Sequence, residues 1–520
     1  MNELRSVRSA SGALFLLLAA NFLLRAFIAV RPIEAIDRLT IPDDAYLSLH
    51  LARNIAHGLG PLYGAACTNG FQPLYVFLCA PAFWMFPTDA TMPVHFALLL
   101  LSVFDTLALY FLFRILRREG FRAESMYVAG VVWLVSPYVI RTTLNGLETM
   151  IASCLMLAFF WYERSHVART SDRVPLRRWC VLGLLAGASI VARIDSAFLV
   201  MILMIAVVVH MRRSGDFSGI APMLGCALLA LVPWLLYSYR STGSFYYVSG
   251  TAVRFLAQSY APPEPTLLNW YFPALGRAII TIAHENWHTG VLIALLAILL
   301  IIGRKPAARL LLDRAGLIAP MAFFVLVLAV VYPLYAPAAW FYPRYLFPSF
   351  LFAVLLVAIL SDILFTTMAD SRRRFYTALG LGICAVLLSV TDRDSTSLFT
   401  SEPQPLKGYR AIGLWVRDSL PSGSIVGAPQ SGAIGYFATN MTVLNLDGVV
   451  NRECLDSLMA NNVAAYIESR KIESIIGWQG NFRFLSVHSR QADRSRFVID
   501  RTIPGVESWG MRWCIGRVVR

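Results

Sequence analysis

Two adjacent carboxylates, Asp43 and Asp44, stand in the first polar segment of the chain, directly after its first long apolar run. Ionisable groups close to hydrocarbon are costly, and they usually persist because a partner, a substrate or a reaction uses them. A carboxylate can take the proton of an attacking hydroxyl group, and two of them can share a divalent ion such as Mg²⁺ or Mn²⁺. Only one of the two can cap the helix that follows, an interaction worth about 1 kcal/mol, so the other is predicted to be free for chemistry.

The helix expected to position this pair covers residues 44–57, between Pro42 and the glycines at 58 and 60. At about 100° per residue, one side of it is apolar. The other side carries the polar side chains Asp43, Tyr46, His50, Arg53, Asn54 and His57. The pattern predicts an amphipathic helix that lies on the membrane with its polar side toward an aqueous cavity, where His50 and Arg53 are candidates for substrate binding.

Further polar residues stand near the same ends of the expected membrane helices. Arginine forks bind phosphate oxygens, and aromatic side chains accept a prenyl chain or a sugar face. The candidates for a lipid phosphate are Arg193, Arg254, Arg344 and Tyr345, and those for substrate binding are Asn69, Gln72, Glu148, Asp195, Tyr246 and Tyr247. Simpler roles stay open, because an arginine at a helix end can be an interfacial anchor and Arg193 with Asp195 can form a local ion pair.

Two other patterns have plainer interpretations. The segment 284–288 reads HENWH and matches the H-E-x-x-H pattern of zinc proteases, but no third ligand is evident, so interfacial histidines are favoured. Asp447 is interpreted as a turn residue. The cysteines have no CxxC spacing, which argues against a zinc site or a disulfide framework, although Cys454 and Cys514 could pair.

The composition indicates a polytopic membrane protein. The 520 residues are 57% hydrophobic and 15% charged, with a mean hydropathy of +0.61. The net charge of +14 comes from short arginine clusters between apolar runs rather than from one basic face, so nucleic acid is not an expected partner, whereas anionic membrane lipid is.

About eleven membrane helices are expected from the apolar runs. These runs are 11–30, 92–114, 125–140, 147–163, 179–193, 196–211, 219–238, 288–303, 316–334, 344–366 and 375–391. With the N-terminus inside, every arginine-rich loop falls on the cytoplasmic side, as the positive-inside rule requires. The run 73–86 does not fit this count and is predicted to be an interfacial or re-entrant helix, the alternative being an ordinary spanning helix.

This topology predicts that loops 31–91 and 239–287 are extracytoplasmic, and the expected location is the bacterial inner membrane. Residues 392–520 alternate helical and short strand patterns, so they are expected to form a small extracytoplasmic α/β domain beside a transmembrane module, 1–391. There is no GxxxxGK[ST] or GxGxxG signature, which disfavours ATP-driven transport. An activated substrate is then most simply supplied by the lipid.

The motifs DDAYLSLHLARNIAHGLGPLYG, NGFQPLYVFLCAP, NGLET, RIDSA, PRYLFP, GAIGYF and LDGVVN occur in that order along the chain. As a set they resemble the GT-C superfamily of polyprenyl-phosphate-sugar-dependent glycosyltransferases, most of all the branch with the mycobacterial arabinofuranosyltransferases. The resemblance implies inverting transfer of arabinofuranose or a similar sugar to a glycan, lipid or protein. It also implies that Asp43 is the base and that Asp44 assists by orienting it, binding the sugar or holding a divalent ion.

This chain departs from the pattern in two respects, since Asp-Asp replaces the Asp-Glu common in relatives and the tail is shorter than in the mycobacterial enzymes. A transporter or flippase of lipid-linked saccharides is the alternative function. It is disfavoured because no internal repeat is evident and the charged residues gather at one boundary rather than at mid-span. A non-catalytic scaffold is disfavoured by the polar side of residues 43–57.

Overall fold

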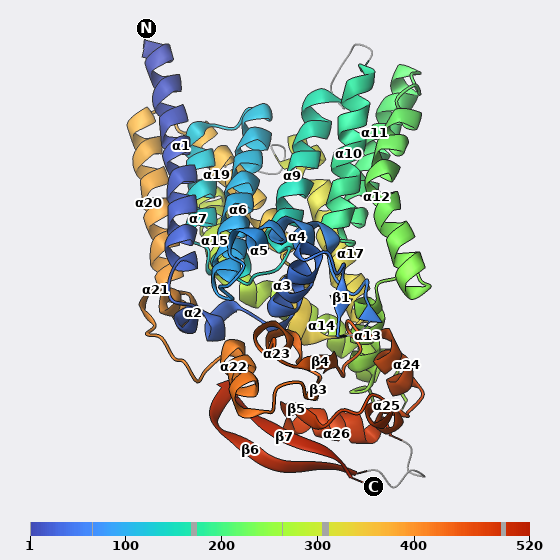
Figure 1. Cartoon of the computed structure of the whole chain (residues 1–520). Coiled ribbons are helices and arrows are strands. Elements are labelled where there is room, and N and C mark those ends of the chain that lie inside the picture. Colours follow the sequence, from blue (N-terminus) through green and yellow to red (C-terminus); the bar gives the residue numbers. More distant parts are fainter. Residues whose placement is uncertain are drawn as a thin grey trace.

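The computed structural model describes residues 2–64, 66–167, 174–262, 264–303, 311–489 and 496–519. Its helices stand side by side in a bundle, with the N-terminus at one end and a C-terminal sheet domain at the other (Figure 1). Two of the predicted basic loops fall partly on residues 168–173 and 304–310, which lie outside the described residues.

Each predicted apolar run overlaps a helix of the bundle. The helices are α1 (Asn2–Ala29), α6 (Met92–Arg118), α7 (Ala123–Val135), α8 (Pro137–Thr143), α9 (Thr149–His166), α10 (Leu176–Ala192), α11 (Ser196–Ser214), α12 (Ile220–Thr242), α15 (Trp287–Ile302), α17 (Ala315–Tyr335), α19 (Pro348–Thr366) and α20 (Ser371–Val390). Among the described residues, six helices are long and apolar enough to cross a membrane, or up to eight if two bent pairs each count as one span. The chain is therefore a multi-pass membrane protein, while the count of about eleven spans stays a prediction.

A buried ionic cluster inside the bundle was not predicted. Arg25 of α1 and Asp105 of α6 pair at 3.1 Å with both side chains fully buried. Asn21 and the indole N–H of Trp133 also donate to the Asp105 carboxylate, at 2.7 and 2.9 Å. Because a buried charge is tolerated only when it is paired and hydrogen-bonded, the cluster ties α1, α6 and α7 together and serves the fold.

The first loop contains α2 (Ile33–Thr40), α3 (Asp43–Ala56), the hairpin β1 (Leu62–Tyr63) and β2 (Ala66–Cys67), and α4 (Pro73–Cys79) and α5 (Pro81–Met85). The predicted helix 44–57 is confirmed as α3, shifted by one residue. The prediction that an aspartate caps this helix is wrong, because the N-cap residue is Pro42 and no side chain caps the helix. Helices α4 and α5 together are about 20 Å long, too short for the roughly 30 Å of hydrocarbon, which favours the predicted interfacial position.

The second long loop contains α13 (Val248–Gln258), η1 (Leu267–Tyr271) and α14 (Phe272–Glu285), and η2 (Ala339–Phe341) and α18 (Tyr342–Tyr345) precede α19. The HENWH segment breaks at Asn286, where the helix direction changes by 74°. Since the H-E-x-x-H pattern needs both histidines on one face of a continuous helix, this break argues against a zinc protease. Glu285 instead pairs with Arg141 at 2.9 Å.

After α21 (Arg393–Thr400), the C-terminal domain forms a mixed sheet of order β4-β3-β5-β7-β6. Strand β3 (Ile425–Ala428) is parallel to β4 (Thr442–Asn445) and β5 (Ser474–Trp478), and β7 (Met511–Val519) is antiparallel to β5 and to β6 (Arg496–Ser508). The helices are α22 (Tyr409–Ser419), α23 (Gly432–Phe437), α24 (Arg452–Met459), α25 (Val463–Ser469) and α26 (Gln479–Val487). The α/β character is confirmed, and Cys454 and Cys514 are both free.

Candidate active site

Helix α3 of the first loop holds the short helix α23 of the C-terminal domain at both ends. The carboxylate of Asp43 accepts the backbone N–H groups of Gly432 and Ala433, at 2.7 and 2.9 Å. Near the end of α3, Arg53 donates to the carbonyl oxygens of Tyr436 and Gly435, at 2.7 and 3.2 Å. Because the two starts and the two ends are in contact, α3 and α23 run in the same direction. Both contacts are favourable, since negative charge stabilises a helix N-terminus and positive charge a helix C-terminus.

A second carboxylate of the first loop meets α22 in a similar way. Asp37 accepts the backbone N–H of Arg410 at 3.0 Å, and its other oxygen accepts the hydroxyl of Tyr46. Glycines permit both approaches. A Cβ at Gly408 would lie 2.0 Å from the Asp37 carboxylate, and one at Gly432 would lie 2.1 Å from the Asp43 carbonyl oxygen.

We expect Gly432→Ala to push α23 away from α3 and to destabilise the protein by about 1–3 kcal/mol, the usual penalty for overpacking a close contact. The thermal midpoint of the purified protein measures the effect. Gly423→Ala is a poor control, because its φ of +88° is itself strained for alanine. Gly480→Ala is the matched control, since a Cβ there meets nothing within 4 Å. Equal midpoints for both variants would contradict the close approach.

The two docking carboxylates also predict a pH dependence. Burial raises the pKa of Asp37 to about 7, although the hydrogen bond from Tyr46 lowers it. Burial likewise raises the pKa of Asp43 to about 7, although the hydrogen bonds from the Ala433 and Gly432 amides lower it. A carboxyl group whose pKa is raised in the folded state contributes stability that is present below the unfolded pKa near 4 and lost as the pH rises through about 7. Burial also raises the pKa of Asp447 to about 7, so this carboxyl group acts in the same sense. Burial, followed by the charge of Arg53, lowers the pKa of His50 to about 3, and this single group acts in the opposite sense below pH 6.5.

We therefore expect the thermal midpoint to fall as the pH rises from 5 to 7. Asp37→Asn should flatten this dependence by about 1.4 kcal/mol per pH unit, the value for one proton. A thermal series at each pH, for the wild type and the variant, measures the difference. An unchanged slope in the variant would show that Asp37 is not the group that titrates.

Asp44 faces away from α23, toward the membrane bundle. Its carboxylate lies 3.5 Å from Arg344, and its side chain keeps 35% of its surface exposed, whereas Asp43 is buried. Burial raises the pKa of Asp44, the charge of Arg344 lowers it, and the negative charge of Glu148 raises it again. Asp44 is thus the less buried carboxylate of the pair.

Arg344 is held between aromatic rings rather than at the surface. Its guanidinium carbon lies 5.1 Å from the ring centre of Phe341 and 5.2 Å from that of Tyr345, and its side chain is only 16% exposed. This burial argues against a simple interfacial anchor. The backbone carbonyl of Arg344 also accepts a hydrogen bond from Arg193 at 3.2 Å.

Arg193 forms the predicted local ion pair with Asp195, at 3.0 Å, and its guanidinium lies 5.2 Å from the ring centre of Tyr345. Tyr332, which was not predicted, donates its hydroxyl to Asp195 and stacks on Tyr345 at 4.4 Å. Among the described residues, Nη2 of Arg193 and Nε of Arg344 are buried without a hydrogen-bond partner. A buried donor without a partner is costly, so two guanidinium groups retain capacity for a further acceptor here.

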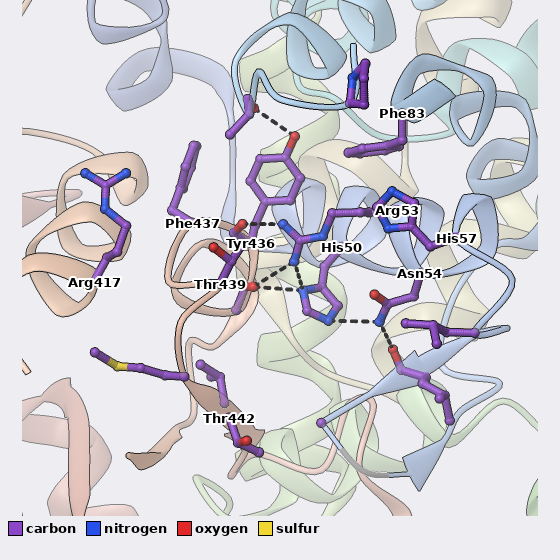
Figure 2. Close-up of a pocket in the computed structure, with 18 of the residues that line it drawn as sticks. His50, Arg53, Asn54, His57, Phe83, Arg417, Tyr436, Phe437, Thr439 and Thr442 are labelled. Atoms are coloured by element: carbon purple, nitrogen blue, oxygen red, sulfur yellow. Dashed lines mark hydrogen bonds between the residues drawn. The ribbon is translucent and has the colours of Figure 1, made fainter. Parts of the chain in front are cut away.

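Two predicted residues on α3 line a separate cavity of about 640 Å³, between α3, the segment after α5 and the C-terminal domain. Figure 2 shows His50, Arg53 and Tyr436 gathered at this cavity. His50 Nδ1 lies 2.9 Å from the Gly435 carbonyl oxygen and 3.0 Å from Arg53 Nη2, and Nε2 lies 3.2 Å from the Asn54 amide. His50 and Arg53 are therefore occupied in docking α23 while they face the cavity.

The remaining predicted residues are distributed around this centre. Glu148 is buried at the start of α9 and acts on Asp44 through its charge. Asn69 joins the two long loops, since it bonds the Tyr246 carbonyl at 3.0 Å and the Val248 N–H at 3.1 Å.

The side-chain Oε1 of Gln72 is buried and has no hydrogen-bond partner among the described residues. Tyr247 packs 5.8 Å from Trp234, and Arg254 lies 5.2 Å from the ring of Tyr335. Asp447 is a turn residue, as predicted, and its carboxylate accepts the Val449 N–H at 2.9 Å.

The acidic pair does not fit a shared divalent ion. Both oxygens of Asp43 accept amide hydrogens from α23, while Asp44 faces Arg344. Within the described ranges, no group of three or more His, Cys, Asp or Glu residues could hold a metal. Because a divalent ion needs several converging oxygen ligands, we derive no step through a metal.

Only the comparison with solved structures finds proteins that match most of this chain. A family model described as a domain of unknown function, DUF8728, matches residues 401–510. No curated protein matches the sequence. ArnT from Cupriavidus metallidurans, solved with undecaprenyl phosphate bound, has a TM-score of 0.58 at 10% identity over 96% of this chain and 97% of that one.

The Archaeoglobus fulgidus oligosaccharyltransferase in its apo form has a TM-score of 0.52 at 14% identity, over 91% of this chain and 71% of that chain. This chain therefore shares the fold of these two solved proteins. For the arabinofuranosyltransferase AftD from Mycobacteria, the TM-score is 0.44 at 14% identity, over 97% of this chain and 40% of that chain. That score is too low to carry an argument, so the arabinofuranosyltransferase-like branch of the GT-C superfamily stays a prediction.

Proposed function

We propose that this chain is a membrane glycosyltransferase that moves a sugar from a polyprenyl-phosphate donor to a hydroxyl group of a glycan, lipid or protein, with inversion. The observation that carries the proposal is Asp44, a partly exposed carboxylate 3.5 Å from a largely buried, ring-flanked arginine, on a fold shared with ArnT. Solved structures with this fold hold undecaprenyl phosphate in ArnT and dolichol-phosphate with an inhibitory peptide in AglB.

The reaction needs a base on the acceptor side and positive charge on the donor side. The acceptor oxygen loses its proton to a carboxylate as its bond to the anomeric carbon forms. The bond from that carbon to the phosphate oxygen breaks, and the polyprenyl phosphate leaves with the electron pair. By analogy with glycosidases, the sugar passes through an oxocarbenium-like state, and a guanidinium group stabilises the leaving phosphate.

The two aspartates are suited to different tasks in this scheme. The sequence predicts Asp43 as the base, but in the structure both of its oxygens bond to α23. The Asp44 carboxylate is partly exposed and has one long contact, with Arg344. We therefore propose Asp44 as the carboxylate that meets the substrates and Asp43 as the group that positions α3. Substitution of each residue separates this assignment from the prediction.

Arg344, with Arg193 and Tyr345, is proposed to hold the donor phosphate. The support is the buried, unpartnered donors on Arg344 and Arg193, both of which flank the Tyr345 ring. We expect Arg344→Gln to raise the KM for the polyprenyl-phosphate-sugar about tenfold or more, because one hydrogen bond to a charged group is worth about 1.5 kcal/mol or more. Steady-state transfer at varied donor concentration measures it, and an unchanged KM would exclude Arg344 from donor binding.

The acceptor is proposed to approach along α3 from the cavity at His50 and Arg53. His50 lies about 9 Å beyond Asp44 along the helix axis. Glu148, Asp195, Asn69, Gln72, Tyr246 and Tyr247 stay proposals for substrate binding, and Arg254 for the lipid. The site is proposed to face the extracytoplasmic side of the bacterial inner membrane, with arabinofuranose or a similar sugar transferred.

Mass spectrometry of lipid extracts from a deletion strain tests the function. We expect a polyprenyl-phosphate-linked sugar to accumulate, and the purified wild-type protein to consume it in the presence of an envelope extract and to release polyprenyl phosphate. Movement of the intact lipid-linked saccharide across a vesicle membrane without such release would favour the transporter alternative. Absence of any accumulating lipid-linked sugar would contradict both functions.

A further inference from the structure

A second cavity lies far from the acidic pair, at the C-terminal ends of α6 and α9. Its volume is about 670 Å³. Helix α6 begins beside α5, and its other end carries the arginines, so this cavity is at the end of the bundle opposite the C-terminal domain (Figure 1). Its lining includes Tyr110, Arg114, Arg117, Arg118, Trp161 and His166.

The positive charge at this cavity is not neutralised by ion pairs with the described residues. Arg114, Arg117 and Arg118 are exposed, and no described residue forms an ion pair with any of them. The nearest acidic side chain in the sequence, Glu119, pairs with Arg164 at 2.7 Å. The charges of Arg178, Arg118 and Arg114 all act on the His166 ring.

Aromatic side chains fix one of these cations in place. The guanidinium of Arg114 lies 4.8 Å from the ring centre of Trp161 and bonds the Tyr110 hydroxyl at 2.7 Å. Such contacts reduce the number of conformations that an arginine must lose when it binds a ligand. The cavity therefore combines a preorganised guanidinium with two further cations on one helical turn.

Helix length places these groups at the depth of lipid headgroups. The 27 residues of α6 extend over about 40 Å, whereas the hydrocarbon core is roughly 30 Å thick, so the last turns of the helix project into the polar region. Trp161 and Tyr110 are the residue types that concentrate at this boundary. A phosphate group in this region meets arginine forks that bind its oxygens in pairs.

We propose that the cavity between the ends of α6 and α9 binds the phosphate of an anionic phospholipid in the leaflet opposite the catalytic site. The site is independent of the proposed sugar transfer, since none of its residues belongs to the acidic centre. The phosphate is contacted by Arg114, Arg117 and Arg118, and Trp161 packs on the upper part of the lipid.

Binding of dioctanoyl phosphatidylglycerol to the full-length protein in detergent tests the proposal, with dioctanoyl phosphatidylcholine as the uncharged comparison. We expect the wild type to bind phosphatidylglycerol at least tenfold more tightly than phosphatidylcholine. Arg114→Gln/Arg118→Gln should remove at least tenfold of this preference. The matched control is Arg372→Gln/Arg373→Gln, which removes two exposed charges at the start of α20 and should change the affinity less than twofold.

Equal affinity for the two lipids, or an equal loss in both double variants, would overturn the proposal by showing general charge attraction. Inorganic phosphate that displaces phosphatidylglycerol at millimolar concentration would assign the site to a free anion and also overturn it. Should Arg114→Gln/Arg118→Gln fail to fold, Arg118→Gln alone keeps the Arg114 contacts with Tyr110 and Trp161 and is expected to weaken binding at least threefold.

Discussion

Replacing Asp44 by asparagine is expected to lower sugar transfer about 10³-fold, within the range that general base catalysis supplies. Asparagine has almost the same shape but cannot accept the proton of the acceptor hydroxyl group. The thermal midpoint should change little, because the Asp44 side chain is 35% exposed and its contact with Arg344 is 3.5 Å long. Transfer from a panel of polyprenyl-phosphate-sugars to envelope acceptor, with the purified variant, measures the loss.

Asp456→Asn is the matched control for this substitution. Asp456 is exposed on α24 of the C-terminal domain, pairs with Arg452 at 2.9 Å and does not line the cavity at α3. We expect this control to retain transfer within about threefold, since it removes an exposed carboxylate without touching the acidic pair. An Asp44→Asn protein that folds normally and retains full transfer would exclude Asp44 as the base.

Replacing Asp43 by asparagine is expected to destabilise the protein by about 3 kcal/mol. The wild-type carboxyl group accepts two amide hydrogens from α23, and a buried amide left without its acceptor costs about 1–3 kcal/mol. An asparagine has one acceptor oxygen and turns an NH₂ group toward the other amide. Above pH 7, where the wild-type group is ionised, the loss is partly offset because a buried charge is removed. A lower thermal midpoint and faster proteolysis between the bundle and the C-terminal domain are the measurements.

This variant distinguishes the two roles of the acidic pair. If Asp43 only positions α3, the Asp43→Asn protein that remains folded at low temperature should keep measurable transfer with a reduced rate. If Asp43 is the base, as the sequence predicts, transfer should be lost even where the thermal midpoint is preserved. Arg53→Met, which loosens the opposite end of the α3–α23 pair, provides the comparison for loosening without loss of a carboxylate.

Local patterns predicted the first loop well. Pro42 and the glycines at 58 and 60 bracket α3, and its side chains divide into an apolar and a polar side, so its bounds are correct within one residue. The same reasoning cannot find a partner for Asp43, because Gly432 lies 389 residues away and nothing in either segment encodes the contact. An aspartate of the acidic pair was therefore predicted to cap α3, whereas Asp43 binds the N-terminal amides of α23.

Other parts of the site were hidden by their surroundings. Tyr332 lies inside the apolar helix α17, where a tyrosine resembles an interfacial side chain, and only its contact with Asp195 shows its role. Arg25 and Asp105 each lie inside or beside an apolar run, and their pairing depends on how α1 and α6 pack. The hairpin of β6 and β7 was missed because charged residues interrupt its alternation.

The helix ends held by Asp37 and Asp43 have a consequence for any attempt to isolate residues 392–520. Expressed alone, this segment would present the amides of Arg410, Gly432 and Ala433 to solvent without the carboxylates that accept them. This segment is therefore an incomplete folding unit. A soluble version would have to include a peptide equivalent to residues 33–56, which carries Asp37 and Asp43. Evolutionary exchange of the tail alone between proteins of this fold would meet the same obstacle, since contacts from the first loop, encoded at the other end of the gene, complete the fold of the tail.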